Sequence, residues 1–180
     1  MQPYCYIDIV QTRRCIKSTK ETISKIRESS SNNCGPRIYI DYLIPLPVKT
    51  TDADIDPWPG GLAQQYKYAE DILKDILLGI VDESSRENCS SQIVSADDCC
   101  GLFIQESPVS PELDVAALLF PSPDQLQNIK EIDNMVGDKR TLIIFNRQFK
   151  QAADFGFFNK AEGKEVMDKY EFGFAFQEIA

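Results

Sequence analysis

The side chains of this sequence that could do chemistry are thiols, carboxylates and hydroxyls, because the chain of 180 residues contains no histidine. The absence of His excludes Ser-His-Asp and Cys-His catalysis and any imidazole pH switch. None of the six cysteines forms a Cys-x-x-Cys pair, so neither a zinc ribbon nor a thioredoxin-like motif is indicated. We expect free thiols in a reducing compartment, and the adjacent Cys99 and Cys100 leave a redox role open.

Three aspartates, Asp52, Asp54 and Asp56, begin like the calcium-binding loop of an EF-hand. The match then fails, because Pro57 stands where that loop needs glycine and Ala63 where it needs a bidentate glutamate. We therefore expect a solvated acidic loop. No other pattern in the chain points to a catalytic residue, a metal ligand or a cofactor site, so none is predicted.

The most distinctive segment holds the only tryptophan of the chain. Trp58 lies between Pro57 and Pro59, which restrict the backbone on both sides of it. Gly60-Gly61 then lets the chain turn tightly into an amphipathic run. Two interpretations stay open: Trp58 closes the end of the core, or the loop over residues 45–61 presents it to a partner.

Composition and charge narrow the class of protein. With 43% hydrophobic residues, the chain can bury the core of one globular domain over residues 1–180. Its formal net charge of −9 argues against nucleic acid or an anionic membrane surface as the main partner. The longest apolar run, residues 115–120, is far too short to span a bilayer. Residues 1–20 lack the apolar stretch of a secretory signal, so we expect none.

Hydrophobic spacing predicts the elements that must position these residues. Apolar residues at helical spacing predict an N-terminal helix over residues 7–28 and a second helix over 62–80, which is the strongest pattern in the chain. β-Branched and aromatic residues predict a strand over 37–44. Short strands are expected at 92–94 and 101–105.

A βαβ unit is predicted over residues 113–146. Residues 113–120 are almost all apolar, as in a strand that is buried on both faces. Ser122 then begins a helix as its N-cap, with Pro123 in the first position and Gln125 in the capping-box position. A second buried strand completes the unit, and the order strand, helix, strand predicts a parallel pair.

An aromatic loop is expected over residues 146–160. The last strand is predicted over 170–179, with Phe172, Phe174 and Phe176 on one apolar face. The chain is therefore predicted to be α/β and to form a single domain. Its small mixed, partly parallel sheet contains the Rossmann-like βαβ unit and is covered by about three helices.

The first candidate binding site is the start of the helix at Ser122. In parallel sheets, ligands gather beyond the carboxyl ends of the strands, where helix N-termini present free amides to anions. Asp124 already lies in the first turn of this helix, and no glycines flank Ser122. A small nucleotide- or metabolite-binding enzyme that uses this N-terminus is the alternative function.

The second candidate site is the aromatic loop, which holds more large side chains than a solvated loop needs. Arginine and aromatic residues are enriched at the centres of protein interfaces. The loop could bind a partner together with Trp58, Pro57 and Pro59, or its phenylalanines could fold back onto the sheet. The loop residues concerned are Arg147, Phe149, Phe155, Phe157 and Phe158.

Five separated segments have an order and spacing that resemble the domain of unknown function nineteen ninety-five, a family of plastid and cyanobacterial proteins. The resemblance covers most of the chain, from about the first strand to the end. It departs from the family at Arg147, where proline is expected, and at Phe149, where tryptophan is usual. The segments are Asp56-Pro57-Trp58-Pro59-Gly60-Gly61-Leu62 leading into Gln65-Tyr66, Leu119-Phe120-Pro121-Ser122, Ile144-Phe145-Asn146-Arg147-Gln148-Phe149, Asp154-Phe155-Gly156-Phe157 and Tyr170-Glu171-Phe172.

The resemblance implies a plastid protein in the stroma or on the stromal face of the thylakoid membrane. It also implies a non-enzymatic role as a photosystem subunit or assembly factor, since some members of the family are assembly factors. Photosystem core or antenna proteins would be the partners, with photosystem I favoured as a stable host and photosystem II as an assembly client. No catalytic residues are established for the family, so the resemblance assigns none here.

Overall fold

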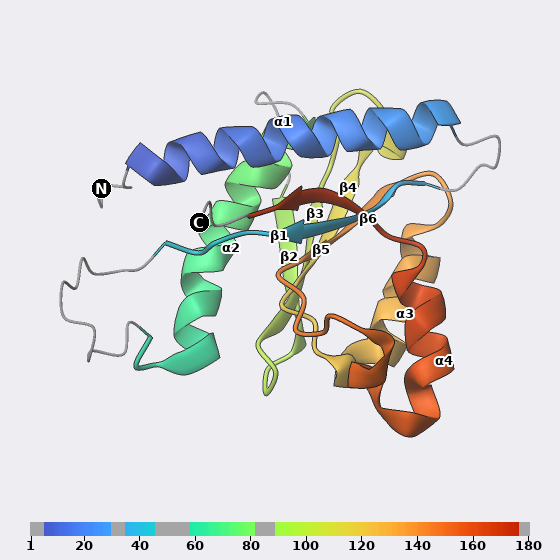
Figure 1. The fold of residues 1–180 in the computed structure, drawn as a ribbon. Helices are drawn as coiled ribbons and strands as arrows, with labels where there is room; N and C mark the ends of the chain where they lie inside the picture. The colour runs from blue at the N-terminus through green and yellow to red at the C-terminus, as the bar shows by residue number, and fades with distance from the viewer. Residues whose placement is uncertain (1–5, 30–34, 46–57, 82–88, 177–180) are drawn as a thin grey trace.

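The computed structural model describes residues 6–29, 35–45, 58–81 and 89–176 (Figure 1). The expected acidic loop, Pro57, Cys5 and Cys34 lie outside this part of the chain. Within the described ranges, no helix is both long enough and apolar enough to cross a membrane.

Six strands form one mixed sheet in the order β2-β3-β4-β5-β1-β6. Four of them, β4, β5, β1 and β6, are parallel to one another. β3 pairs antiparallel with β4 on one side and with the edge strand β2 on the other. The strands are β1 (Arg37–Asp41), β2 (Cys89–Ser95), β3 (Cys100–Gln105), β4 (Val115–Leu119), β5 (Thr141–Phe145) and β6 (Glu171–Ala175).

Helices cover both faces of this sheet (Figure 1). α1 (Tyr6–Ser29) and α2 (Gly61–Val81) pack on one face, and α3 (Leu126–Val136) and α4 (Gly156–Met167) pack on the other. Short 3₁₀ turns precede β4, α3 and α4 at Pro111–Leu113, Pro123–Gln125 and Ala152–Phe155.

The central strands are apolar on both sides because each face of the sheet meets a pair of helices. All residues of β4 and of β5 are buried. Strand alternation divides them between two cores. Ala117 and Leu119 join the core under α1 and α2, whereas Ala116 and Leu118 join the core under α3 and α4.

The predicted α/β architecture is confirmed. α1 exceeds the predicted span of 7–28 by one residue at each end, and α2 includes all of the predicted 62–80. β4 and β5 pair in parallel, with Val115 opposite Thr141, as the predicted βαβ unit requires. The strand predicted at 92–94 is confirmed as the central part of β2.

The aromatic loop predicted over residues 146–160 is wrong in its last five residues, 156–160, which belong to α4. This fourth helix buries only Gly163 and Val166, and its first turn exposes Phe157 and Phe158. Its apolar residues therefore form no continuous stripe at helical spacing, and this is why hydrophobic periodicity does not reveal it.

The last strand, predicted over residues 170–179 with one apolar face, is shorter and changes face along its length. Tyr39 of β1 pairs with Phe172 of β6, but the next residue of β1, Ile40, pairs with Phe174, so β6 contains one extra residue at this point. This bulge reverses the alternation of side chains. Phe172 packs beside the Tyr39 ring under α3 and α4, while Phe174 packs against the core under α1 and α2. The inserted residue is Gly173, at a position where a Cβ would press on α1 and β1.

Candidate functional site

The carboxyl ends of β1, β4 and β5 border a cavity of about 310 Å³ that α2 closes on one side. This edge of a parallel sheet is where ligands usually bind, because the chain leaves each strand there in a loop. Three kinds of side chain line the cavity. They are aromatic (Tyr42, Trp58, Phe120), aliphatic (Leu43, Ile44, Leu62) and amide (Gln65, Asn146, Gln148).

Two of the three amides in this wall hold the loops together. Asn146 Oδ1 accepts a hydrogen bond from the Tyr42 amide at 2.6 Å, and Asn146 Nδ2 donates to the Tyr42 carbonyl at 2.9 Å. Gln148 Nε2 donates to the Phe120 carbonyl at 2.8 Å. The described residues of the wall include no carboxylate, amine or thiol, so they present aromatic and aliphatic surface rather than a group that titrates near pH 7.

Two residues of the wall have left-handed backbone conformations. Phe120 has φ 54° and Asn146 has φ 51°, and each directly follows the last residue of a buried strand. Such a conformation costs about 1–3 kcal/mol for a residue other than glycine and persists only where the surroundings hold it. The Phe120 amide donates to the Phe145 carbonyl at 3.0 Å and the Asn146 amide to the Ile40 carbonyl at 2.8 Å, so both turns are fixed.

Trp58 lies in the wall of this cavity and is half-buried. Its ring meets the edge of the Tyr68 ring on α2, with centroids 5.5 Å apart. The turn into α2 is closed by a hydrogen bond from the Gly61 amide to the Trp58 carbonyl at 2.7 Å, and Gly61 takes the left-handed φ of 59°. Pro59 is exposed. The tryptophan therefore forms the boundary between the core and the surface.

The aromatic segment after β5 divides into a buried part and an exposed part. Phe149 and Phe155 are buried and pack together with ring centroids 4.7 Å apart. Phe157 and Phe158 are 89% and 92% exposed. Of the two alternatives left open by the sequence, folding back onto the sheet holds for Phe149 and Phe155, which join the core under α3 and α4, whereas Phe157 and Phe158 stay exposed.

Arg147 is not a free surface cation either. Its guanidinium lies over the Tyr39 ring at 4.2 Å and the Phe172 ring at 5.0 Å, and its side chain is only 9% exposed. Arg147 Nε is 3.7 Å from the Asp41 carboxylate. Burial raises the pKa of the Tyr39 phenol to about 12, and the nearby guanidinium opposes this shift. The expectation that Arg147 lies exposed in a binding loop is therefore wrong, because its guanidinium packs against the Tyr39 and Phe172 rings within the fold.

Ser122 begins a single 3₁₀ turn, and α3 follows only after it. The predicted capping box is wrong, because the Ser122 side chain makes no capping hydrogen bond and its Oγ is buried without a partner in the described structure. The Gln125 side chain instead bonds to Asp98 and Asn128. Ser122 does not line the carboxyl-edge cavity. The nucleotide- or metabolite-binding alternative stays a prediction.

The prediction of free thiols is confirmed for the four cysteines in the described part of the chain. Cys15 and Cys100 are buried, whereas Cys89 and Cys99 are partly exposed. Burial raises the pKa of both buried thiols from 9.0 to about 12. A thiol with such a pKa is almost entirely protonated near pH 8, and the thiol form is a poor nucleophile.

We therefore expect maleimide at pH 8 to modify Cys99 while Cys15 and Cys100 stay unmodified until the chain unfolds. Peptide mapping of the modified protein measures this, with the denatured chain as the control. Because folding raises these two pKa values, the unfolded state releases the thiol protons first as the pH passes 9, and folding stability falls above that pH. Fast modification of Cys100 in the folded protein would contradict this assignment.

Sequence reasoning found Trp58 but missed Tyr42 and Phe120, which share its cavity. Tyr42 and Phe120 each follow directly after a buried strand, and position at the carboxyl end of a parallel strand is the signal that could have identified them. Within the described ranges, no three His, Cys, Asp or Glu side chains gather as metal ligands do. No protein-family model, curated protein or solved structure matches the chain.

Proposed function

We propose that this chain is a non-enzymatic protein that docks on a photosynthetic complex on the stromal side of the thylakoid membrane, as a peripheral subunit or an assembly factor. The observation that carries the docking role is the pair of exposed phenylalanines, Phe157 and Phe158, at the start of α4. The five sequence segments that resemble the plastid family support the choice of partner.

The two phenylalanines form a compact apolar feature. Their rings meet edge to face, with centroids 5.6 Å apart at an angle of 86°. Exposed single hydrophobic residues are common, but two adjacent phenylalanines that are each about nine-tenths exposed are typical of a binding surface. Burying one phenylalanine in a partner contributes about 1.5–3 kcal/mol.

The segment that carries the pair is held in place before any partner binds. Asp154 Oδ2 accepts hydrogen bonds from the Lys150 amide at 2.7 Å and the Gln151 amide at 3.1 Å. Gly156 takes a φ of 77°, and the buried Phe155 anchors the turn below it. A surface that is already ordered loses little conformational entropy on binding, which favours affinity.

The cavity at the carboxyl edge supports the same role. Trp58 lines it together with Asn146 and Gln148, which belong to the segment that leads from β5 to α4. An aromatic, uncharged hollow of this kind suits an apolar side chain of a partner protein. The predicted partner-binding roles of Trp58 and Pro59 remain part of the proposal, while Pro57 lies outside the described residues.

Substitution of both exposed phenylalanines by serine, F157S/F158S, is expected to weaken binding to photosystem particles about a hundredfold or more, because it removes about 1.5–3 kcal/mol at each position. The measurement is the amount of tagged chain that runs with the particles on a native gel of solubilised thylakoids. The melting temperature is expected to stay unchanged, because neither ring is packed in the core.

The matched control is Ile93→Ser, which removes a side chain that is 70% exposed on the edge strand β2. This variant is expected to co-migrate like the wild type. A wild-type chain that runs alone on the gel, under conditions that preserve the particles, would contradict the proposed partner. Unchanged binding by F157S/F158S would contradict the proposed surface.

A further inference from the structure

We propose that the groove between α1 and the edge strand β6 binds an extended, acidic segment of a partner protein, which adds to the sheet as a strand beside β6. This mode is β-strand addition, in which backbone hydrogen bonds give affinity and flanking side chains give specificity. The inference does not depend on the proposed photosynthetic partner, because it concerns the opposite side of the sheet from α4 and Phe157.

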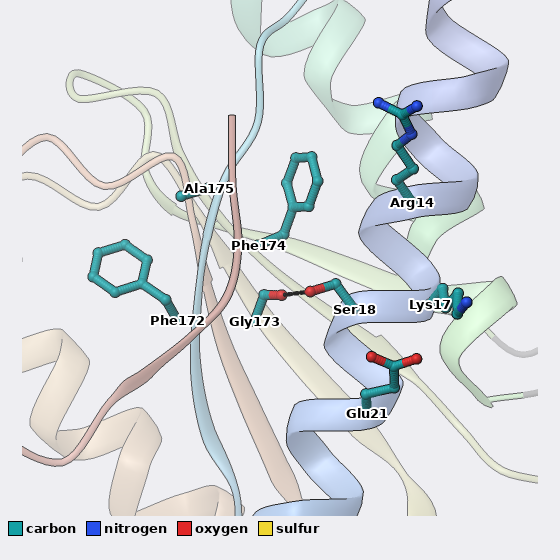
Figure 2. A pocket seen from close by; sticks show the side chains of 8 residues that line it. All are labelled: Arg14, Lys17, Ser18, Glu21, Phe172, Gly173, Phe174 and Ala175. Carbon is teal, nitrogen blue, oxygen red and sulfur yellow. Dashed lines mark hydrogen bonds between the residues drawn. The ribbon is translucent and has the colours of Figure 1, made fainter. Parts of the chain in front are cut away.

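The groove has a volume of about 490 Å³ (Figure 2). One wall is formed by four consecutive residues of β6 and the other by the exposed side of α1. β6 is the last strand in the order of the sheet, so β1 pairs with only one of its two edges. The lining residues used below are Arg14, Lys17, Ser18 and Glu21 on α1, and Gly173 and Ala175 on β6.

Backbone hydrogen bonds show which groups of β6 face the groove. The Phe176 amide donates to the Asp41 carbonyl of β1 at 2.9 Å, so Phe176 points toward the sheet. Since neighbouring residues of a strand direct their backbone groups to opposite edges, the amide and carbonyl of Ala175 point away from β1. The Gly173 carbonyl points the same way, because Ser18 Oγ donates to it at 2.6 Å across the groove (Figure 2).

The Ser18 bond crosses the groove at Gly173, between Arg14 and Glu21, and leaves the edge at Ala175 open in the described structure (Figure 2). An edge that offers an unpaired amide and carbonyl is a template for another strand. The bulge at Gly173 places Phe172 and Phe174 on opposite faces of β6, so an added strand would find an aromatic neighbour on each face.

Charge identifies the chemistry of the added strand. α1 carries six basic and three acidic residues, a net charge of +3, in a chain whose net charge is −9. Arg14 and Lys17 are exposed on the groove wall, and Glu21 lies one turn beyond Lys17. Carboxylates on the added strand would pair with Arg14 and Lys17. Glu21, on the other side of the Ser18 bond, would repel a carboxylate that extends past Gly173, which favours a strand that pairs at Ala175.

An extended polypeptide fits these observations better than a lipid surface does. A flat membrane can contact the basic residues of α1, but it cannot place donors and acceptors against the backbone of Ala175. The net charge of the whole chain also opposes binding to an anionic membrane.

The experiment uses the full chain and a fluorescein-labelled peptide of about eight residues in which glutamate alternates with threonine and valine, long enough to form one strand. Fluorescence polarisation is expected to show saturable binding that weakens as salt screens the charges. A peptide with lysine in place of glutamate is expected to bind about tenfold more weakly or not at all.

Two variants distinguish the contribution of ion pairs to peptide binding from that of backbone hydrogen bonds. R14E/K17E is expected to weaken binding about tenfold, while Lys25→Glu, an exposed charge reversal on the same helix outside the groove, leaves it unchanged. Ala175→Pro removes the outward amide without breaking a bond to β1, and it is expected to weaken binding equally at an unchanged melting temperature. If that variant does not fold, a peptide N-methylated at alternate residues tests the same backbone bonds on the wild type.

Two results would overturn the inference. The first is peptide binding that depends on Arg14 and Lys17 but is unaffected both by Ala175→Pro and by N-methylation, which would mean a simple charge attraction. The second is binding of phosphatidylglycerol vesicles through Arg14 and Lys17 with no binding of the acidic peptide, which would assign the basic side of α1 to a membrane. Neither result depends on whether the chain binds a photosystem.

Discussion

Replacing Arg37 by alanine is expected to destabilise the fold by about 3–5 kcal/mol, the usual cost of removing one partner from a buried ion pair. Arg37 is the first residue of β1 and is only 4% exposed. Its Nε pairs with Asp133 near the end of α3. The loss comprises both this ion pair and the hydrogen bonds that the guanidinium makes to backbone carbonyls.

Those hydrogen bonds tie three segments together. Arg37 Nη2 donates to the Gly137 carbonyl at 2.8 Å, and Nη1 donates to the Arg140 carbonyl at 2.9 Å and to the Gly35 carbonyl at 3.2 Å. A cation at the C-terminus of α3 also interacts favourably with the helix dipole. With alanine at this position, three carbonyls lose a charged donor in a place that admits little water.

Urea unfolding followed by circular dichroism measures this effect, and the midpoint is expected to fall while the slope of the transition stays constant. Arg37→Lys is the informative comparison, because lysine keeps the charge but lacks the planar fork, and we expect it to recover only part of the loss. Arg13→Ala, an exposed arginine on α1, serves as the control and should leave the midpoint unchanged. A midpoint for Arg37→Ala equal to that of the wild type would show that the buried pair contributes no net stability.

Replacing Phe149 by alanine is expected to lower the free energy of unfolding by about 3–5 kcal/mol, because it leaves a cavity in a close-packed core. Phe149 is fully buried under α3 and α4 and packs against Phe155, which in turn supports the first turn of α4. The cost combines the lost burial of the ring with the empty space left beside Phe155. Thermal and urea unfolding both measure it.

Phe157→Ala is the matched control, since it makes the same chemical change only eight positions away, at a ring that is almost wholly exposed. We expect its stability to equal that of the wild type, while its binding to a partner decreases. The pair of variants therefore separates core phenylalanines from surface phenylalanines within one short segment. Equal destabilisation by both substitutions would mean that the first turn of α4 packs on the protein rather than on a partner.

Local patterns in the sequence identified most of the elements of the fold. The long amphipathic helices α1 and α2 and the apolar strands β4 and β5 were found because burial on one stripe, or on both faces, leaves a period that hydrophobicity alone reveals. α4 was missed because it buries only Gly163 and Val166, so it has almost no period to detect. The bulge at Gly173 was missed because the alternation of phenylalanines in the sequence does not show that β6 has one residue more than its neighbour β1 in this stretch.

The residues of the candidate sites could not be identified from the sequence alone, because their exposure depends on tertiary contacts. The segment after β5 contains Arg147 and four phenylalanines, and residue type alone does not distinguish a buried ring from an exposed one. The structure buries Phe149 and Phe155, sandwiches Arg147 against Tyr39 and Phe172, and exposes Phe157 and Phe158. The basic residues Arg14 and Lys17 were visible in the sequence, but the groove they line depends on the position of β6 at the edge of the sheet.

The sequence by itself determined the class of this protein, since alternating apolar runs and amphipathic helices admit one economical solution, a sheet with helices on both faces. It also determined the acidic charge and the absence of imidazole chemistry. Only the tertiary structure decided which aromatic side chains face solvent, that Trp58 shares a cavity with Asn146, and that a basic helix borders an open strand edge. The last two facts depend on contacts between segments more than 80 residues apart, and no local propensity specifies such contacts.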